Sequence, residues 1–285
     1  MDIPLLNHFI SLVIFSLMLT IGLTHPFGQL LSLWRQPEVL IRSLLAVIVL
    51  VPLVVFLLLR LFDLPPAVAT GLALLAASPG APLTTKRAQM AGGDPFYSAS
   101  LQLTLALGAI VITPLTLAIL YALFELETER VTWLIVAGQV AKVTFLPVII
   151  GLLVQRFAAK VAEVTGKPLV VFANVLFILL NVSLLVALVL APDLRMMLRV
   201  GWLAGAAIVI MVAAALAIGH LLGGPSRAAR SSLAIASVAR NIGLSLYIAT
   251  LSDAGQGAIP TILVYTILGG LLAVPYGVWN KRKMR

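Results

Sequence analysis

Nine apolar runs, each long enough to cross a lipid bilayer as a helix, divide this chain of 285 residues. A hydrocarbon core about 30 Å thick needs about 20 helical residues, because an α-helix rises about 1.5 Å per residue. Only 10% of the residues are charged, against about 25% in a soluble domain. The sequence therefore predicts a single all-α polytopic membrane domain over residues 1–285, with nine transmembrane helices. The runs cover residues 4–23, 39–59, 65–91, 96–124, 131–153, 168–190, 200–222, 231–251 and 259–279.

Residues that carry catalytic or metal chemistry are scarce in this sequence. It has no cysteine, and its three histidines, His8, His25 and His220, are far apart. A disulfide framework and a thiolate nucleophile are excluded, and a histidine metal site is not indicated. The runs also contain no nucleophile–base pair and no carboxylate pair, so we expect a protein that is not an enzyme and that holds no cofactor.

The positive charges indicate which helix ends face the cytoplasm. A net charge of +9 would suggest a nucleic-acid partner in a soluble protein, but here the cations gather in the connections between runs. With the N-terminus outside, eleven cations fall in cytoplasmic segments and four in outer ones, in agreement with the positive-inside rule. We therefore expect a multi-pass protein of a bacterial-type plasma membrane, with a cytoplasmic C-terminus and no nucleic-acid partner. The eleven are Arg35, Arg42, Arg156, Lys160, Lys167, Arg227, Arg230, Lys281, Arg282, Lys283 and Arg285, and the four are Arg60, Arg130, Arg195 and Arg199.

The third run, residues 65–91, contains SPGAPLTTKR and should not form one continuous helix. Pro79 and Pro82 lack the N–H groups that would continue the helical hydrogen bonds, and Gly80 lies between them. The sequence predicts a break in the middle of the membrane, although a simple proline kink is the alternative. A break at that depth is tolerated only where protein or a water-filled cavity surrounds it, and it is the usual construction of a transporter site.

Arg240 lies about ten residues inside the eighth run, residues 231–251, and hence near the bilayer midplane if this run spans the membrane. A guanidinium at that depth costs roughly 2.5–3.5 kcal/mol on insertion scales, which makes Arg240 a candidate functional residue. Asn241 and Gly243 follow it in the sequence VARNIG, and this favours a second break. A continuous helix that faces a polar bundle interior is the alternative.

The positions of the unusual runs suggest internal symmetry. The third and eighth runs are five spans apart, and at the same offset Pro114 in the fourth run corresponds to Pro275 in the ninth. An odd offset reverses the orientation in the membrane, so the pattern predicts inverted repeats in which runs one to four match runs six to nine.

The order of these features resembles the bile acid:sodium symporter family. The likeness is carried by LVIFSLMLTIGL, by FDLPPAVATGLALLAASPGAPLTTKRAQMAGGDP and by SVARNIGLSLYIA, and it extends from about Phe15 to Tyr276. Pro79-Gly80-Ala81 and the later Gly93-Asp94 are similar to the family's Pro-Gly-Gly break and its Gly-Asp turn.

The resemblance implies a particular architecture. The third and eighth runs would cross as broken helices, with SPGAPLTT against VARNIG, inside a core domain that lies beside a panel domain. The core domain would comprise residues of about 39–124 and 200–279, and the panel domain residues of about 4–23 and 131–190.

The resemblance also implies two sodium sites, but this chain lacks their acidic ligand. Ala236 stands where the family has a glutamate, and Arg240 stands in place of a glutamine. A carboxylate offsets the dehydration of a hard cation, and none of the nine runs contains Asp or Glu, so we do not expect classical coupling to two sodium ions. Remnants of the first site would be Thr84, Thr85, Ser98 and Gln102, and the second site corresponds to Val47, Ala236 and Arg240.

Two interpretations of the intramembrane cations remain open. In the first, Arg240 and Lys86 bind an anionic substrate at the crossing. In the second, Arg240 replaces a bound cation by bonding carbonyls freed at the break, such as those of Leu75 and Ser78, while Lys86 and Arg87 snorkel toward the inner surface. For Arg87 the snorkelling interpretation is preferred. The candidate substrate-binding residues are Pro79, Gly80, Thr84, Thr85, Lys86, Arg240 and Asn241.

The sixth run also contains polar residues, and Asn174, Asn181 and Ser183 are candidates for a translocation path. Taken together, the sequence predicts a secondary transporter of small organic anions that works by alternating access. A sodium-independent uniporter or an anion channel is the alternative. The expected partners are a small organic anion and the lipid bilayer.

Overall fold

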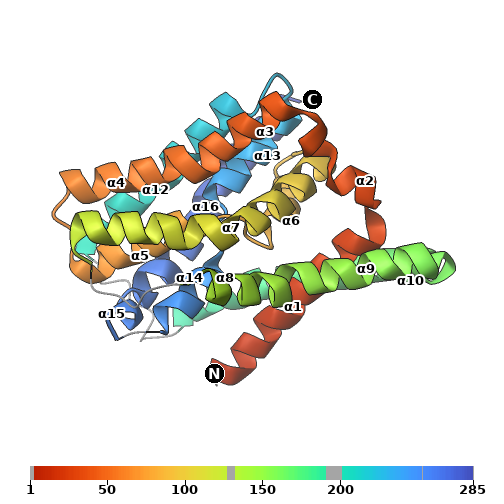
Figure 1. Ribbon diagram of the computed structural model, residues 1–285, viewed down its shortest axis with the longest axis horizontal. Helices are drawn as coiled ribbons and strands as arrows, with labels where there is room; N and C mark the ends of the chain where they lie inside the picture. The colour runs from red at the N-terminus through yellow and green to blue at the C-terminus, as the bar shows by residue number, and fades with distance from the viewer. Residues whose placement is uncertain (1–2, 127–131, 191–200, 252, 285) are drawn as a thin grey trace.

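The computed structural model describes residues 3–126, 132–190, 201–251 and 253–284, and within them it consists of helices and the segments that connect them, without strands (Figure 1). The predicted all-α class is therefore confirmed. Seven helical stretches in these residues are long and apolar enough to cross a membrane, and Ser11–Thr24 and Pro66–Ala77 are shorter apolar helices. The count of nine spans stays a prediction.

The helices follow the apolar runs, with interruptions inside the second, third, fifth and eighth runs. In chain order they are α1 (Ile3–Thr24), α2 (Phe27–Leu30), the 3-10 helix η1 (Ser32–Arg35), α3 (Pro37–Leu44), the π-helix η2 (Leu45–Leu50), α4 (Val51–Leu61), α5 (Pro66–Ala77), α6 (Thr84–Met90), α7 (Pro95–Phe124), α8 (Trp133–Val140), the π-helix η3 (Ala141–Phe145), α9 (Leu146–Phe157), α10 (Ala159–Leu190), α12 (Gly201–Leu222), α13 (Arg227–Val238), α14 (Ile242–Ala249), α15 (Asp253–Gln256) and α16 (Ile259–Arg282).

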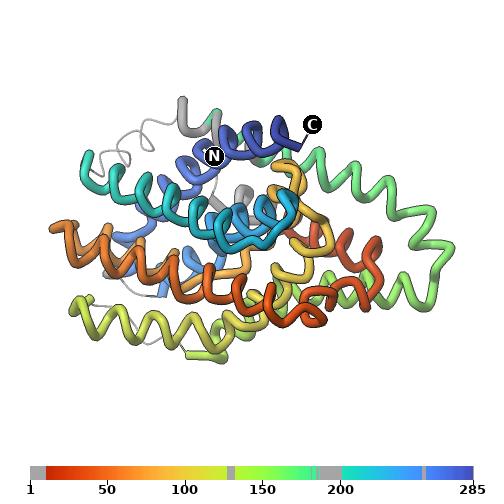
Figure 2. The backbone as a smooth tube through the Cα atoms, turned by 90° about the horizontal axis from the view of Figure 1, so that it is seen from above, coloured from red at the N-terminus to blue at the C-terminus, as the bar shows by residue number. Residues whose placement is uncertain are grey.

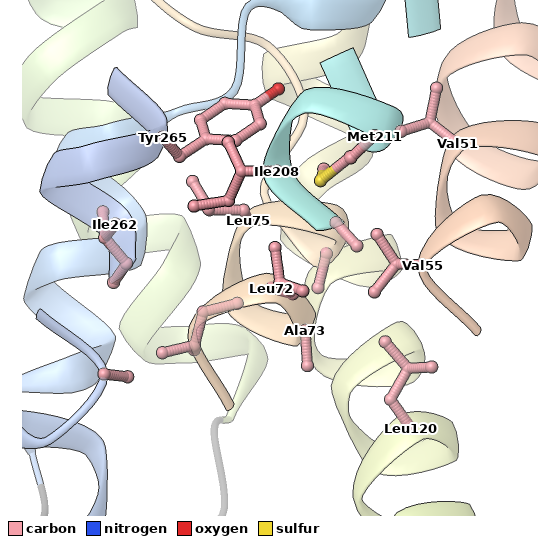
Figure 3. Close-up of a cluster of buried hydrophobic side chains, with 14 of the residues drawn as sticks. Val51, Val55, Leu72, Ala73, Leu75, Leu120, Ile208, Met211, Ile262 and Tyr265 are labelled. Atoms are coloured by element: carbon pink, nitrogen blue, oxygen red, sulfur yellow. The ribbon is translucent and has the colours of Figure 1, made fainter. Parts of the chain in front are cut away.

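Helix α5 lies at the centre of the main apolar core. Every residue from Val68 to Ala77 is buried, and the helix packs against α4, α7, α14 and α16. Figure 3 shows Leu72 and Leu75 of α5 among Met211 of α12 and Tyr265 of α16. A helix that is apolar on all sides must be surrounded by protein or lipid, and here protein surrounds it.

Helices α1, α9 and α10 form a second group with an apolar cluster of its own, which we call the three-helix group. The α9–α10 hairpin extends beyond the other helices in both views (Figures 1 and 2). The backbones of α1 and α9 touch: a Cβ on Gly22 would lie 2.2 Å from the Val148 carbonyl oxygen, and one on Gly151 would lie 2.6 Å from that of Leu19. Glycine is required at this contact because any side chain would meet main chain.

The fifth run contacts both groups. Val136 and Val140 of α8 belong to the main core, and α8 packs against α7, whereas α9 packs against α1. The π-helical turn η3 joins the two halves of the run. The predicted domain boundaries, which place all of residues 131–190 in a panel domain, stay a prediction.

We expect Gly151→Ala to destabilise the protein, because the added Cβ would overlap the main chain of α1. Overpacking of this kind lowers the free energy of unfolding by about 1–3 kcal/mol, which a lower melting temperature of the purified protein in detergent would report. Gly138→Ala on α8 is the matched control, because a Cβ there meets no atom within 4 Å. Equal melting temperatures for the two variants would contradict the contact between α1 and α9.

Candidate functional site

The third and eighth runs are both broken, and the breaks meet. Helix α5 ends at Ala77 and α6 begins at Thr84, while α13 ends at Val238 and α14 begins at Ile242. The two non-helical segments are joined by a main-chain hydrogen bond, in which the Asn241 N–H donates to the Ser78 carbonyl at 2.8 Å. The predicted breaks are therefore present, and we call the place where they meet the crossing.

Gly80 lets the first break fit against α7. Its φ of +77° lies in the left-handed region, and a Cβ would be 2.6 Å from the Ala106 amide nitrogen. Both the backbone conformation and the close approach require glycine.

Asn241 organises the second break. Its side-chain oxygen accepts from the Leu244 N–H at 3.1 Å and so caps the N-terminus of α14. One turn later, the Ser245 hydroxyl donates to the Leu74 carbonyl at 3.2 Å. Asn241 and Ser245 thus tie α14 to the end of α5.

Arg240 is fully enclosed by the protein, with only 2% of its surface exposed. Its guanidinium donates to the carbonyl of Val47 at 3.2 Å and to that of Ser237 at 2.7 Å, while its Nε has no partner among the described residues. The hydroxyl of Tyr265 lies beside it and donates to the Val238 carbonyl at 2.7 Å.

The carbonyl partners that we expected for Arg240 were wrong. The Leu75 carbonyl accepts from the Ser78 N–H at 3.2 Å, and the Ser78 carbonyl accepts from Asn241. The carbonyls freed by the first break are therefore used by the backbone of the crossing itself. Arg240 instead bonds carbonyls of the second run and of α13.

The remnants of the first cation site form two small clusters. The Thr85 N–H and hydroxyl both donate to Gln102 Oε1, at 2.9 and 2.8 Å. The Ser98 hydroxyl lies 2.7 Å from the Asp94 carbonyl and 2.8 Å from the Ser232 hydroxyl. Most of these oxygens are thus engaged with one another. Thr84 is buried, and its hydroxyl has no partner in the described part of the chain.

A cavity of about 520 Å³ lies between α10 of the three-helix group and helices α6, α13 and α16. It reaches from Val238 and Ala239 at the second break to Lys281, near the end of the chain. Its walls are mostly apolar, and Phe177 of α10 is among them. The cations that line it are Arg87 and Lys281.

Arg87 was not among the predicted site residues, because we expected it to snorkel toward the membrane surface. The structure places it in the cavity wall, half-buried, without an acidic partner among the described residues. The ion pair that those residues do form is Glu38 with Arg42, at the surface. The short distance from Arg87 to the end of α6 suggested that its side chain reaches the membrane surface. The sequence could not show that α10 and α16 leave a space beside α6.

The predicted substrate-binding residues do not line this cavity. Lys86 is half-buried on α6 and is not part of its lining, and Arg240 and Asn241 lie at the crossing, where they directly follow Ala239 of the cavity wall in the chain. Asn174 and Ser183 of α10 are also absent from its lining, and the side chain of Asn181 lies outside the described residues. Their roles in substrate binding stay predictions.

The sequence model described as the Sodium Bile acid symporter family matches residues 11–192. The match takes in the first break, α6 and α7, whereas the second break with Arg240 lies beyond it. No curated protein matches the chain. Because the family match covers more than half of the 285 residues, the chain belongs to the sodium bile acid symporter family.

Proposed function

We propose that this protein is a secondary transporter of small organic anions that works by alternating access, and that the cavity beside Arg87 is the substrate path. Membership in the family indicates a membrane transporter of the bile acid or organic anion type. The observation that carries the proposed substrate path is a cavity that runs from the crossing to Lys281 and is lined by Arg87, which has no acidic partner among the described residues.

The dimensions and chemistry of the cavity suit an anion with an apolar body. Its volume of about 520 Å³ lies within the usual range of ligand pockets, about 300–1,000 Å³. Arginine presents a planar fork of N–H donors that matches a carboxylate or sulfonate, and the apolar walls strengthen the attraction by excluding water. An anionic headgroup on Arg87 with an apolar body along α16 is therefore the arrangement that we favour.

Alternating access requires the cavity to open on one side at a time. Its two walls come from different helix groups, since α10 packs with α1 and α9, while α6 and α16 both pack against α13. A rocking movement between these groups would change which end of the cavity is open. We propose that the three-helix group and the remaining helices act as the panel and core domains.

We expect transport to proceed without sodium. In the described residues, Asp and Glu lie only in connections or in the first two turns of helices. The Asp94 carboxylate, which belongs to the residue that Ser98 contacts, already accepts from the Tyr97 N–H at 2.7 Å. The Gln102 oxygen that could help to bind a cation accepts two hydrogen bonds from Thr85. Oxygens that are already engaged in this way compensate poorly for the water that a sodium ion loses on binding.

Filling the cavity should block transport. Gly270 lines it, and a Cβ there meets no atom within 4 Å, so Gly270→Leu should fold normally while its side chain occupies the path. In proteoliposomes, a panel of labelled anions (a bile acid, a keto acid and an alkyl sulfonate) first identifies a transported probe, and uptake of that probe should fall at least tenfold. Gly205→Leu on α12 is the matched control, because it is equally unobstructed and does not line the cavity. Full uptake by the Gly270 variant would show that the path lies elsewhere.

Arg87 and Lys86 are neighbours on α6. Removing the positive charge of one at a time shows which of the two binds the anion. Arg87→Gln should raise the KM for the transported anion by about tenfold or more, because a hydrogen bond to a charged group contributes roughly 1.5–3 kcal/mol. Lys86→Gln, which does not alter the cavity wall, should leave the KM within about twofold. A larger rise in KM for Lys86→Gln than for Arg87→Gln would instead support Lys86 as the substrate ligand, as predicted from the sequence.

Replacing sodium by choline should leave the initial rate of uptake unchanged in proteoliposomes. A strict sodium requirement would show that the neutral oxygens at the crossing suffice for coupling. Counterflow of unlabelled against labelled anion should be saturable, whereas an anion channel would give electrodiffusive current without counterflow.

A further inference from the structure

The guanidinium of Arg240 is held by main-chain oxygens from two separate helical segments. The Val47 carbonyl belongs to η2 and the Ser237 carbonyl to the last turn of α13. No acidic residue of the described chain pairs with it, although it is 2% exposed. A buried charge without a counter-ion needs strong dipoles around it, and here carbonyl dipoles provide them.

The Val47 carbonyl is free because of the local helix geometry. In η2 the hydrogen bonds run from residue i to residue i−5, and the Val51 N–H donates to Ala46. The next N–H in that pattern would belong to Pro52, which has none. The Val47 oxygen therefore receives no amide from its own helix and accepts from Arg240 instead.

The Ser237 carbonyl is free because α13 ends there. The last carbonyls of a helix lack intrahelical partners and carry the negative end of its dipole. In α13, the Ser237 carbonyl accepts from the Arg240 guanidinium, and the Val238 carbonyl accepts from the Tyr265 hydroxyl. The Ser237 hydroxyl is also buried, and it has no partner among the described residues. The end of α13 therefore presents the Ser237 carbonyl to the guanidinium, together with the negative end of the helix dipole, which attracts a cation.

We propose that Arg240 is the permanent occupant of a cation site built from the Val47 and Ser237 carbonyls, and that removing its side chain leaves a site that binds a free guanidinium ion. The site holds the second run against the break in the eighth. Because its cation is covalently attached, occupancy of the site does not change with the ions in solution. This site lies at the crossing and is independent of which substrate is transported.

The test is chemical rescue of Arg240→Ala, measured as the melting temperature of the purified protein in detergent. Millimolar guanidinium should raise the melting temperature of this variant saturably, by roughly 2–4 °C, and should leave that of the unchanged protein constant. Urea has nearly the same shape without the charge, so it should not rescue. Arg227→Ala is the matched control, since Arg227 is an exposed arginine on the same helix α13, and guanidinium should have no saturable effect on it.

Two variants extend the test if Arg240→Ala yields no folded protein. Arg240→Lys retains the charge and should remain more stable than Arg240→Gln, which retains donors without charge and should gain stability from guanidinium. An Arg240→Gln variant as stable as the unchanged protein would overturn the proposal, because hydrogen bonding alone would then suffice. Equal rescue by urea and guanidinium, or no rescue of a folded alanine or glutamine variant, would also overturn it.

Discussion

Broken backbone inside a membrane needs a partner for every freed carbonyl and amide, and this constraint shapes the centre of the protein. Lipid offers no such partners, so they must come from the chain itself or from a water-filled cavity. At the crossing, the Asn241 N–H bonds the Ser78 carbonyl, and the Ser245 hydroxyl bonds that of Leu74. Each break is thus completed by groups from the other. In agreement with this constraint, α5 and α13 lie buried among other helices.

Much of this was predictable from the sequence, because proline and glycine act locally. The SPGAP segment predicted the first break from missing N–H groups, and the polar residues of VARNIG predicted the second from their cost in lipid. The partners of Arg240 were not predictable in the same way. They depend on a π-helical turn in a segment, LAVIVL, whose apolar residues are equally typical of a plain α-helix. Only Pro52 marks the place where a carbonyl is left free, and a proline alone does not distinguish a π-turn from a kink.

Arg87 shows a second limit of sequence reasoning. Lys86 and Arg87 are adjacent cations on one helix, and from the sequence we favoured Lys86 as the substrate ligand and expected Arg87 to reach the membrane surface. Adjacent helical residues point about 100° apart, so only one of them faces the space beside α10 and α16. Which one does is decided by how the three-helix group packs, a long-range property that local patterns do not contain. The inverted repeats and the domain boundaries likewise depend on how helices that are distant in the sequence pack together.

Arg240, which is buried, and Arg87, which is half-buried, differ in whether their hydrogen-bonding groups already have partners, and this difference distinguishes a structural role from a binding role. Arg240 already has two carbonyl acceptors and is closed off from solvent, so an arriving anion would have to displace bonds that hold the crossing together. Arg87 has no acidic partner among the described residues and faces a cavity, so an anion there gains an interaction without breaking one. A cation in an apolar span is therefore not by itself evidence of a substrate site. The informative quantity is the capacity for hydrogen bonding and charge pairing that the fold leaves unused.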